Sequence, residues 1–196
     1  PLRPVFLWTG LPVPSSLSFR DYSLPSAISN LNASLDHHVD HLPFPLNINS
    51  LYYSFALFGG TAMTLAIVIA ILFLGRKRND NIVHLARISL LPSFMNSNQI
   101  MAFGIPLFLN PYFILPTIFS PLASVILGAC FIKLKWITPA VFQLPAYTPN
   151  FLGAFISSNG DWRALLASVL ILLVSVLIYL PFISHWLKEV DHAKNN

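Results

Sequence analysis

Three stretches of this sequence carry no charge over a length that can cross a lipid bilayer. A transmembrane helix needs roughly 20 consecutive apolar residues to cross about 30 Å of hydrocarbon. Residues 53–74 and 164–184 meet this requirement, and charged residues follow or flank both of them. Only 9% of the chain is charged while 55% is hydrophobic, which leaves too few charges to cover a water-soluble surface. The sequence therefore predicts an all-α membrane protein and argues against a cytosolic enzyme and a nucleic-acid binder.

The third uncharged stretch, residues 99–132, is interrupted by Pro106, Pro111, Pro116 and Pro121. Each proline lacks an N–H group and clashes with the preceding turn, so a single straight helix is disfavoured. We expect a re-entrant hairpin near 99–111 and a spanning helix near 112–132, which gives about three transmembrane helices plus a proline-broken hairpin. Broken segments at membrane depth indicate a transport site, although a kinked helix without a ligand remains an alternative.

A second irregular stretch, residues 136–160, contains Pro139, Pro145 and Pro149 among aromatic and small residues. It is too apolar for a solvated loop and too broken for a helix. We therefore expect it to be partly buried against the helices.

The distribution of basic residues predicts the orientation in the membrane. Cytoplasmic loops carry an excess of Lys and Arg. Residues between the first span and the hairpin are therefore expected inside, together with the C-terminal tail: Arg76, Lys77, Arg78, Arg87, Lys188 and Lys194. Lys133, Lys135 and Arg163 then lie outside, against the rule.

The densest group of titratable side chains occupies residues 36–41, where His37 and His41 have the spacing of a two-histidine metal site on a helix. Because further ligands are lacking, we expect a solvated segment beside the membrane rather than a metal centre. Cys130 lies inside a predicted span and is expected to pack in the core. No set of residues suited to acid–base or nucleophilic catalysis is evident, so we assign no catalytic residue and no cofactor.

The most informative polar patch is Asn96-Ser97-Asn98-Gln99, directly before the apolar residues 100–104. Its amides and hydroxyl supply the donors and acceptors that sugar hydroxyls require. Aromatic faces such as Tyr147, Phe103 or Trp136 could cover a sugar ring. The alternative is a simple polar turn, since Asn and Ser are common turn residues.

Several segments along residues 50–185 resemble a known family. They are similar, in the same order, to the C-terminal half of the membrane permease (enzyme IIC) of the lactose/cellobiose/chitobiose family of the bacterial phosphotransferase system. The matching segments are Phe58-Gly59-Gly60-Thr61-Ala62-Met63-Thr64-Leu65, the run from Asn96 to Pro111, Tyr147-Thr148-Pro149, Gly160-Asp161-Trp162-Arg163 and Ile178-Tyr179-Leu180-Pro181-Phe182. The second is similar to the family pattern Asn-x-Asn-Glu-Pro-x-x-Phe-Gly-x-Pro-x-x-x-Asn-Pro.

The resemblance implies a multi-pass protein of the bacterial cell membrane that is a homodimer in the full-length family. Such a permease takes up a β-linked disaccharide or glucoside for phosphorylation by the cytoplasmic enzyme IIB, so the phosphoryl chemistry lies on another protein. Residues 51–185 would then be the C-terminal half of the permease domain, 1–50 the remainder of a larger permease and 186–196 a cytoplasmic tail. The substrate-binding candidates are Asn96, Asn98, Gln99, Asn110, Tyr147 and Thr148.

The chain departs from the family pattern where the family has the glutamate that binds the sugar. Gln99 occupies that position, Ile100 replaces the following proline, and the family's Gly-x-His-Gly motif has no histidine in its best local match, residues 10–13. A charge-assisted hydrogen bond contributes about 1.5–3 kcal/mol against about 1 for a neutral amide, so sugar affinity falls by up to about one and a half decades. The alternative function is a non-transporting membrane remnant or scaffold that binds a partner through residues 188–196.

Overall fold

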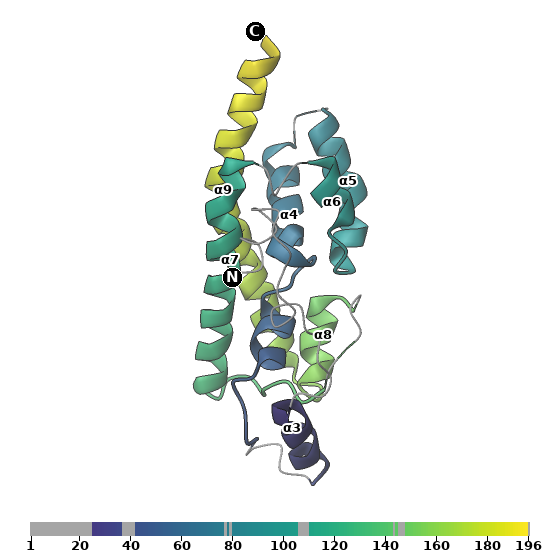
Figure 1. Cartoon of the computed structure of the whole chain (residues 1–196), viewed down its shortest axis with the longest axis vertical. Coiled ribbons are helices and arrows are strands. Elements are labelled where there is room, and N and C mark those ends of the chain that lie inside the picture. The colour runs from purple at the N-terminus through teal and green to yellow at the C-terminus, as the bar shows by residue number, and fades with distance from the viewer. Residues whose placement is uncertain are drawn as a thin grey trace.

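The computed structural model describes residues 25–36, 42–76, 78, 80–105, 110–142, 144 and 148–195, and every regular element in these ranges is a helix. Two of these helices, α7 (Pro111–Lys133) and α9 (Trp162–Asn195), are long and apolar enough to cross a bilayer. They confirm the spans predicted near 112–132 and 164–184. Figure 1 shows α7 and α9 packed side by side, and they are in contact.

The centre of the molecule is α4 (Thr64–Leu74), which packs between α9 and α5 (Figure 1). Ala66, Ile67 and Val68 are completely buried, as are Ala70 and Ile71 one turn later. Together with Leu65, which is 3% exposed, these residues surround the helix axis, so α4 is buried on all sides along most of its length and only Phe73 near its end is exposed. It forms the core against which the other helices pack.

The prediction of one helix over residues 53–74 is wrong, because the backbone breaks in the middle of this stretch. A π-helix, η2 (Asn49–Tyr53), is followed by an irregular segment and a short 3₁₀-helix, η3 (Thr61–Met63), before α4 begins. Gly59 and Gly60 have φ angles of 75° and 90°. Such angles are incompatible with a right-handed helix and are favourable for glycine. Hydropathy, which had predicted the span, is insensitive to this break.

The structure contains a helical hairpin, but the predicted bounds of 99–111 are wrong, because its turn lies before residue 99. Its first arm is α5 (Asn81–Phe94), its second arm is α6 (Gln99–Gly104), and residues 95–98 form the tip between them. The sequence had suggested no helix over α5. Residues 106–109 of the predicted hairpin lie outside the described part of the chain.

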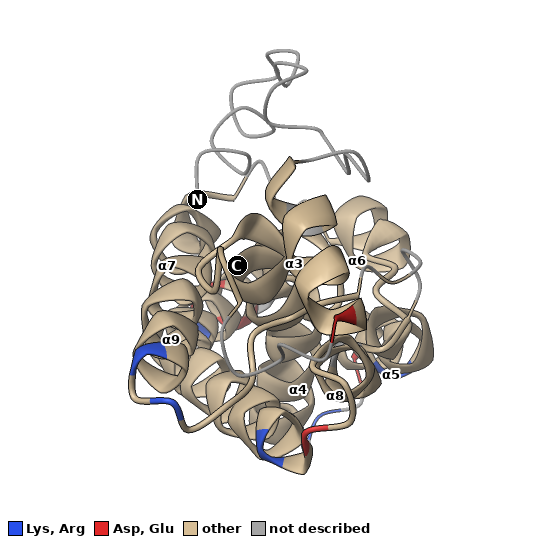
Figure 2. Cartoon of the chain, turned by 90° about the horizontal axis from the view of Figure 1, so that it is seen from below, with Lys and Arg blue, Asp and Glu red and all other residues tan. Residues whose placement is uncertain are grey.

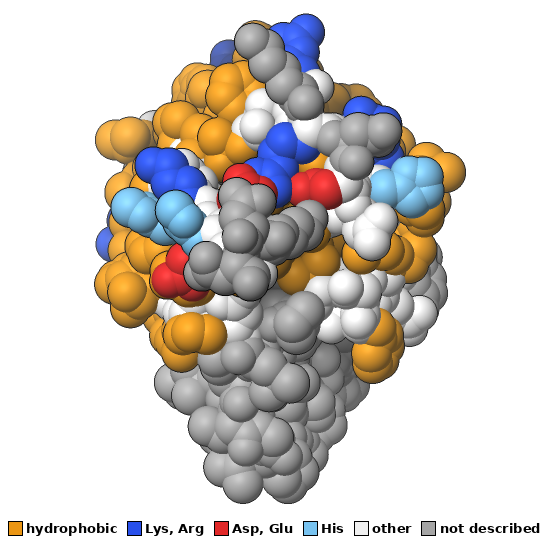
Figure 3. Space-filling view, turned by 90° about the horizontal axis from the view of Figure 1, so that it is seen from above, with side chains coloured by type: hydrophobic (Ala, Val, Ile, Leu, Met, Phe, Trp, Pro, Cys, Tyr) orange, Lys and Arg blue, Asp and Glu red, His pale blue; other side chains and the backbone are white. Residues whose placement is uncertain are grey.

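The hairpin returns to the end of the molecule from which it starts. Before α5, Arg78 forms an ion pair with Asp191 near the end of α9, with Nη2 and Oδ1 2.6 Å apart. After the hairpin, the Tyr112 hydroxyl at the start of α7 donates to Glu189, also near the end of α9. Charged side chains and histidines gather at this end (Figure 3). Arg78 and the end of α9 therefore lie at the same end of the molecule, which is compatible with the orientation proposed from the basic residues.

The opposite end contains the helix α3 (Pro25–Leu35) together with the end of α7, the start of α9 and the stretch between them (Figure 1 and Figure 2). Ile137 and Val141 are only 3% and 4% exposed, which confirms that residues 136–160 are partly buried. The same stretch contains the helix α8 (Asn150–Ser157), so the expectation that it is too broken for a helix is wrong.

Three further features bear on the sequence predictions. A short helix, α3 (Pro25–Leu35), lies within residues 1–50. Helix α9 continues without a break past residue 186, where the sequence analysis places the start of the tail. Cys130 is exposed on α7, so the prediction that it packs in the core is wrong.

Candidate functional site

The break before α4 lies against the tip of the hairpin, and two glycines permit the approach. A Cβ atom on Gly60 would lie 3.2 Å from the backbone oxygen of Asn96 and 3.3 Å from the Asn98 side chain. A Cβ atom on Gly59 would lie 2.3 Å from the backbone nitrogen of Leu65, closer than any real contact. Both positions therefore require glycine. The hairpin tip contacts the backbone of Gly60 directly, with no side chain between them.

Asn96 joins the tip to two other segments. Its Oδ1 accepts a hydrogen bond from the Gly59 N–H at 3.0 Å, and its Nδ2 donates to the backbone oxygen of Thr148 at 2.6 Å. Asn96 itself has a φ of 58°, a left-handed conformation that Asn tolerates better than most residues. Because both ends of this amide are used within the protein, Asn96 positions the tip.

Asn98 and Gln99 have amide side chains with unused hydrogen-bonding capacity. Within the described residues neither side chain has a hydrogen-bond partner; Asn98 is half-buried and Gln99 is exposed. Phe103 follows Gln99 by one helical turn on α6 and is 88% exposed. Side chains four residues apart lie on the same face of a helix. The amide of Gln99 and the aromatic ring of Phe103 therefore lie on the same face of α6.

Three phenylalanines from different elements meet beside the tip. The rings of Phe58 and Phe151 have centroids 5.4 Å apart, and those of Phe94 and Phe151 are stacked at 5.8 Å. Phe94 ends α5, Phe58 precedes the glycine pair and Phe151 belongs to α8. The sequence analysis missed this cluster, because nothing in the order of these residues indicates that they meet. Trp136, proposed as a cover for a sugar ring, packs instead against Phe131 with centroids 4.9 Å apart.

The remaining predicted residues are placed differently. Asn110 caps α7, its Oδ1 accepting from the Tyr112 N–H at 3.1 Å, and no described contact joins it to the tip. Thr148 lies at the tip through the hydrogen bond from Asn96. Tyr147 and the pair His37 and His41 lie outside the described residues, and the described ones contain no cluster of three or more side chains suited to a metal.

A buried polar cluster holds the helix break from the side of α7 and α9. The hydroxyls of Ser120 and Ser124 lie 3.1 and 3.2 Å from the sulfur of Met63, which is completely buried. The Tyr179 hydroxyl donates to the backbone oxygen of Ala62 at 2.5 Å. This bond satisfies a carbonyl that the break removes from helical pairing. The break is thus a fixed feature of the fold.

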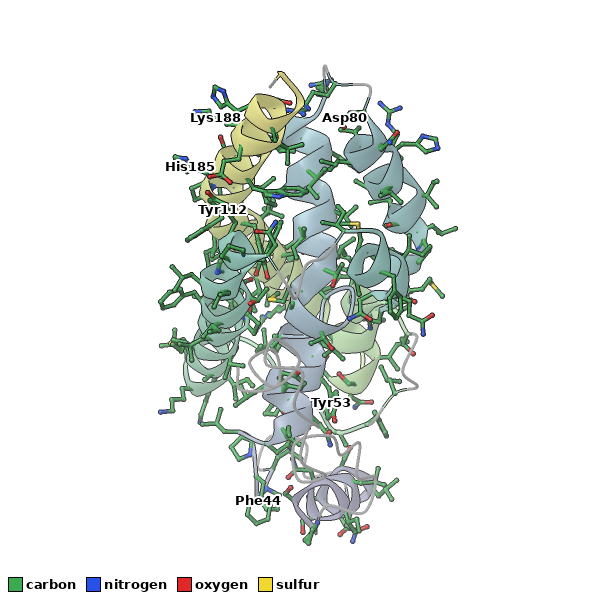
Figure 4. The ribbon with its side chains drawn as sticks, turned by 45° about the horizontal axis from the view of Figure 1, so that its top comes forward. Phe44, Tyr53, Asp80, Tyr112, His185 and Lys188 are labelled. Atoms are coloured by element: carbon green, nitrogen blue, oxygen red, sulfur yellow. The ribbon has the colours of Figure 1, made fainter. Side chains whose placement is uncertain are left out.

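The charged end of the molecule is separate from the tip. Tyr112, His185, Lys188 and Asp80 lie toward this end in Figure 4. Arg78 donates to Asp80 and Asp191 there, and Asp80 also caps α5 by accepting from the Val83 N–H. Hydrogen bonds, first to Asp191 and then to Asp80, raise the pKa of Arg78 above its ordinary value. This network anchors the first arm of the hairpin to α9.

Comparison with known proteins places the chain among sugar permease components. It is 31% identical over 168 residues to the "PTS system cellobiose-specific EIIC component" of Lactococcus lactis, which covers 86% of this chain and 33% of that protein. It is 31% identical over 134 residues to the "PTS system lactose-specific EIICB component" of Staphylococcus aureus strain N315, covering 68% and 23%. The chain thus spans about a third or less of these relatives.

Among solved structures, the chain resembles the transporter ChbC, the IIC component from the N,N'-diacetylchitobiose-specific phosphotransferase system. The TM-score is 0.69 at 17% identity, and the match covers 99% of this chain and 48% of that one. At this sequence identity, the structural likeness supports a shared fold alone. No family model matches the chain.

Proposed function

Because the chain belongs to the EIIC permease family of the phosphotransferase system, we propose that it binds a β-linked disaccharide or glucoside at the hairpin tip and passes it across the cell membrane. Enzyme IIB would phosphorylate the sugar on the cytoplasmic side. The observation that carries this proposal is the contact between the tip and the helix break at Gly60, beside the Asn98 and Gln99 amides, which have no partner among the described residues.

The chemistry of the tip suits a sugar. Each primary amide offers two donors and one acceptor, which matches hydroxyl groups that both donate and accept. Non-helical backbone inside a membrane persists where it is buried in protein or lines a water-filled path, and broken helices form the substrate sites of many transporters. The break at Gly59 and Gly60 and the hairpin tip supply two such segments at one place.

We assign different roles to the residues of the polar patch. Asn96 positions the tip, since both ends of its amide are used by Gly59 and Thr148. Asn98 and Gln99 bind the sugar hydroxyls, and Phe103 covers a ring face from the same side of α6 as Gln99. Asn110 supports the site indirectly by starting α7. Tyr147 and the Thr148 side chain are assigned to sugar binding on the family resemblance alone.

The second candidate function is a membrane remnant or scaffold that no longer transports sugar. The observation that favours it is Gln99, which stands where the family pattern has glutamate. A neutral amide donates and accepts hydrogen bonds but binds a hydroxyl less strongly than a carboxylate.

Exchange of this residue separates the two functions. Gln99→Glu should tighten binding of cellobiose or lactose by up to about one and a half decades, because it restores a charge-assisted hydrogen bond. Isothermal titration of the purified chain measures this change. The control is Asn159→Asp, which introduces the same charge on an exposed residue beyond the end of α8. Equal effects of both variants, or none, would remove Gln99 from the site.

Transport is tested by uptake of radiolabelled cellobiose that depends on phosphoenolpyruvate, in cells that lack their own permease for this sugar. Uptake above that of cells without the chain supports the permease. Sugar binding without any uptake, also with enzyme IIB supplied, favours the remnant.

A further inference from the structure

Ser93 has the one buried side-chain oxygen or nitrogen in the described part of the chain without a hydrogen-bond partner. It lies in the last turn of α5 and is completely buried. A hydroxyl that is removed from water without a partner destabilises the fold. Native proteins rarely retain such groups, so each calls for an explanation.

The other buried serines of the long helices show what is usual in this protein. Ser89, one turn earlier on α5, donates to the backbone oxygen of Leu85 at 2.7 Å. Ser124 and Ser175 donate to the carbonyls four residues before them, both at 2.8 Å. Ser93 occupies the same kind of position but has no such bond. The orphan hydroxyl is therefore a local exception.

Ser93 lies directly under the hairpin tip. Its backbone oxygen accepts from the Asn96 N–H at 3.1 Å, and the preceding residue, Pro92, accepts from the Ser97 N–H at 2.9 Å. The tip thus folds back over the last turn of α5. The neighbouring ring of Phe94 is stacked on Phe151. Because Ser93 is completely buried, a ligand reaches its hydroxyl only when this turn or the tip above it shifts.

We propose that Ser93 is a further binding residue of the tip, and that its hydroxyl forms a hydrogen bond with a sugar hydroxyl when the ligand occupies the site. The inference rests on the proposed function. A serine hydroxyl can both donate to and accept from a sugar hydroxyl. Since Ser93 has no hydrogen-bond partner among the described residues, a bond to the ligand is formed there without breaking another one. The unpaired hydroxyl is then a cost of the unliganded state that binding removes.

The experiment compares Ser93→Ala with Ser89→Ala, two removals of a buried hydroxyl on the same helix. Ser93→Cys is a second variant, in which a slightly larger thiol of the same shape replaces the hydroxyl but forms only weak hydrogen bonds. Binding of cellobiose, lactose and N,N'-diacetylchitobiose to the purified full chain in detergent is measured by isothermal titration. The Tm of each unliganded variant is measured in parallel.

We expect Ser93→Ala and Ser93→Cys to bind the best of these sugars about 3- to 10-fold more weakly, with a Tm equal to or above that of the wild type. Ser89→Ala should lower the Tm and leave the affinity unchanged, because its hydroxyl is bonded to Leu85.

Wild-type affinity in both Ser93 variants would overturn this inference alone. So would an equal loss of affinity in Ser89→Ala, because the effect would then not depend on the orphan hydroxyl. If the wild type binds none of the three sugars, the proposed function fails, and the role of Ser93 fails with it.

Discussion

Tyr179 and Ala62, which are far apart in the sequence, form the contact that most directly stabilises the helix break. Ala62 and Met63 have φ angles of 67° and 52°, a left-handed conformation that costs an L residue roughly 1–2 kcal/mol. The buried hydroxyl of Tyr179 donates to the Ala62 carbonyl, and serine hydroxyls surround the Met63 sulfur. The strain persists because the neighbouring helices fix it.

Tyr179→Phe removes this bond and leaves a buried carbonyl unpaired. We expect it to lower the free energy of unfolding by about 1–3 kcal/mol. The control is Tyr112→Phe, which removes the exposed hydrogen bond to Glu189 and should cost clearly less, because solvent screens an exposed contact. Unfolding in detergent, followed by circular dichroism, measures both. Equal costs for the two variants would show that the Tyr179 hydroxyl has no special role in the break.

At this scale, sequence reasoning identified the polar patch but could not divide its roles. The run of Asn96, Asn98 and Gln99 is visible because three amides adjoin an apolar segment. That Asn96 is used internally depends on Gly59 and Thr148, which lie far away in the sequence. Ser93 was missed for a similar reason, since only its surroundings distinguish it from Ser89.

Among the elements, the interrupted stretch before α4 shows what hydropathy can and cannot predict. Hydropathy depends on side chains, and residues 53–74 contain no charge, so a continuous span was the natural expectation. The break is a backbone property, indicated only by the pair Gly59 and Gly60. Helix α5 was missed because Arg87 interrupts the apolar run that indicates a span and Pro92 is unfavourable inside a helix. The span of α7 was predictable because its hydropathy stays high across Pro116 and Pro121. The helix also continues through both prolines.

The contact between the tip and the break can be tested at Gly60. Gly60→Ala places a methyl group 3.2–3.3 Å from Asn96 and Asn98 on a backbone with a φ of 90°. We expect it to destabilise the protein by about 1–3 kcal/mol and to weaken sugar binding, since the tip must move away. Unfolding in detergent and isothermal titration measure the two effects.

Gly153→Ala is the matched control for this substitution. The added methyl group would meet Leu144 at 3.7 Å, an ordinary contact. Gly153 lies inside α8, where alanine is the better helix former. If Gly60→Ala is tolerated as well as Gly153→Ala, the tip does not rest on the break as described.

The anchoring of the hairpin to α9 can be tested at Arg78. Arg78→Ala removes the ion pairs with Asp80 and Asp191, and we expect faster hydrogen exchange in the first turns of α5. Arg87→Ala, an exposed arginine on the same helix, is the control and should leave this exchange unchanged. Exchange followed by mass spectrometry on peptides that cover residues 80–90 gives the comparison. Unchanged protection in Arg78→Ala would mean that the ion pairs do not hold the arm.

For the whole molecule, composition and family resemblance predicted the class of protein, and packing decided the rest. The shortage of charge and the long apolar runs predicted an all-helical membrane protein, which the described residues and the likeness to a solved transporter confirm. The ion pair between Arg78 and Asp191 brings together basic segments that the orientation rule had placed on one side. Many large apolar side chains stay exposed, among them Phe73, Leu91 and Leu177. Such a surface suits a lipid environment or further protein, and the chain spans only part of its relatives.

The central claim is that the amides at the hairpin tip bind a sugar. The most direct measurement is the affinity of the double variant Asn98→Leu with Gln99→Leu for cellobiose, lactose and N,N'-diacetylchitobiose, by isothermal titration beside the wild type. Each leucine has a similar size but forms no hydrogen bond, so we predict a loss of at least about tenfold for the sugar that the wild type binds best. Wild-type affinity in the double variant, at an unchanged Tm, would contradict the claim.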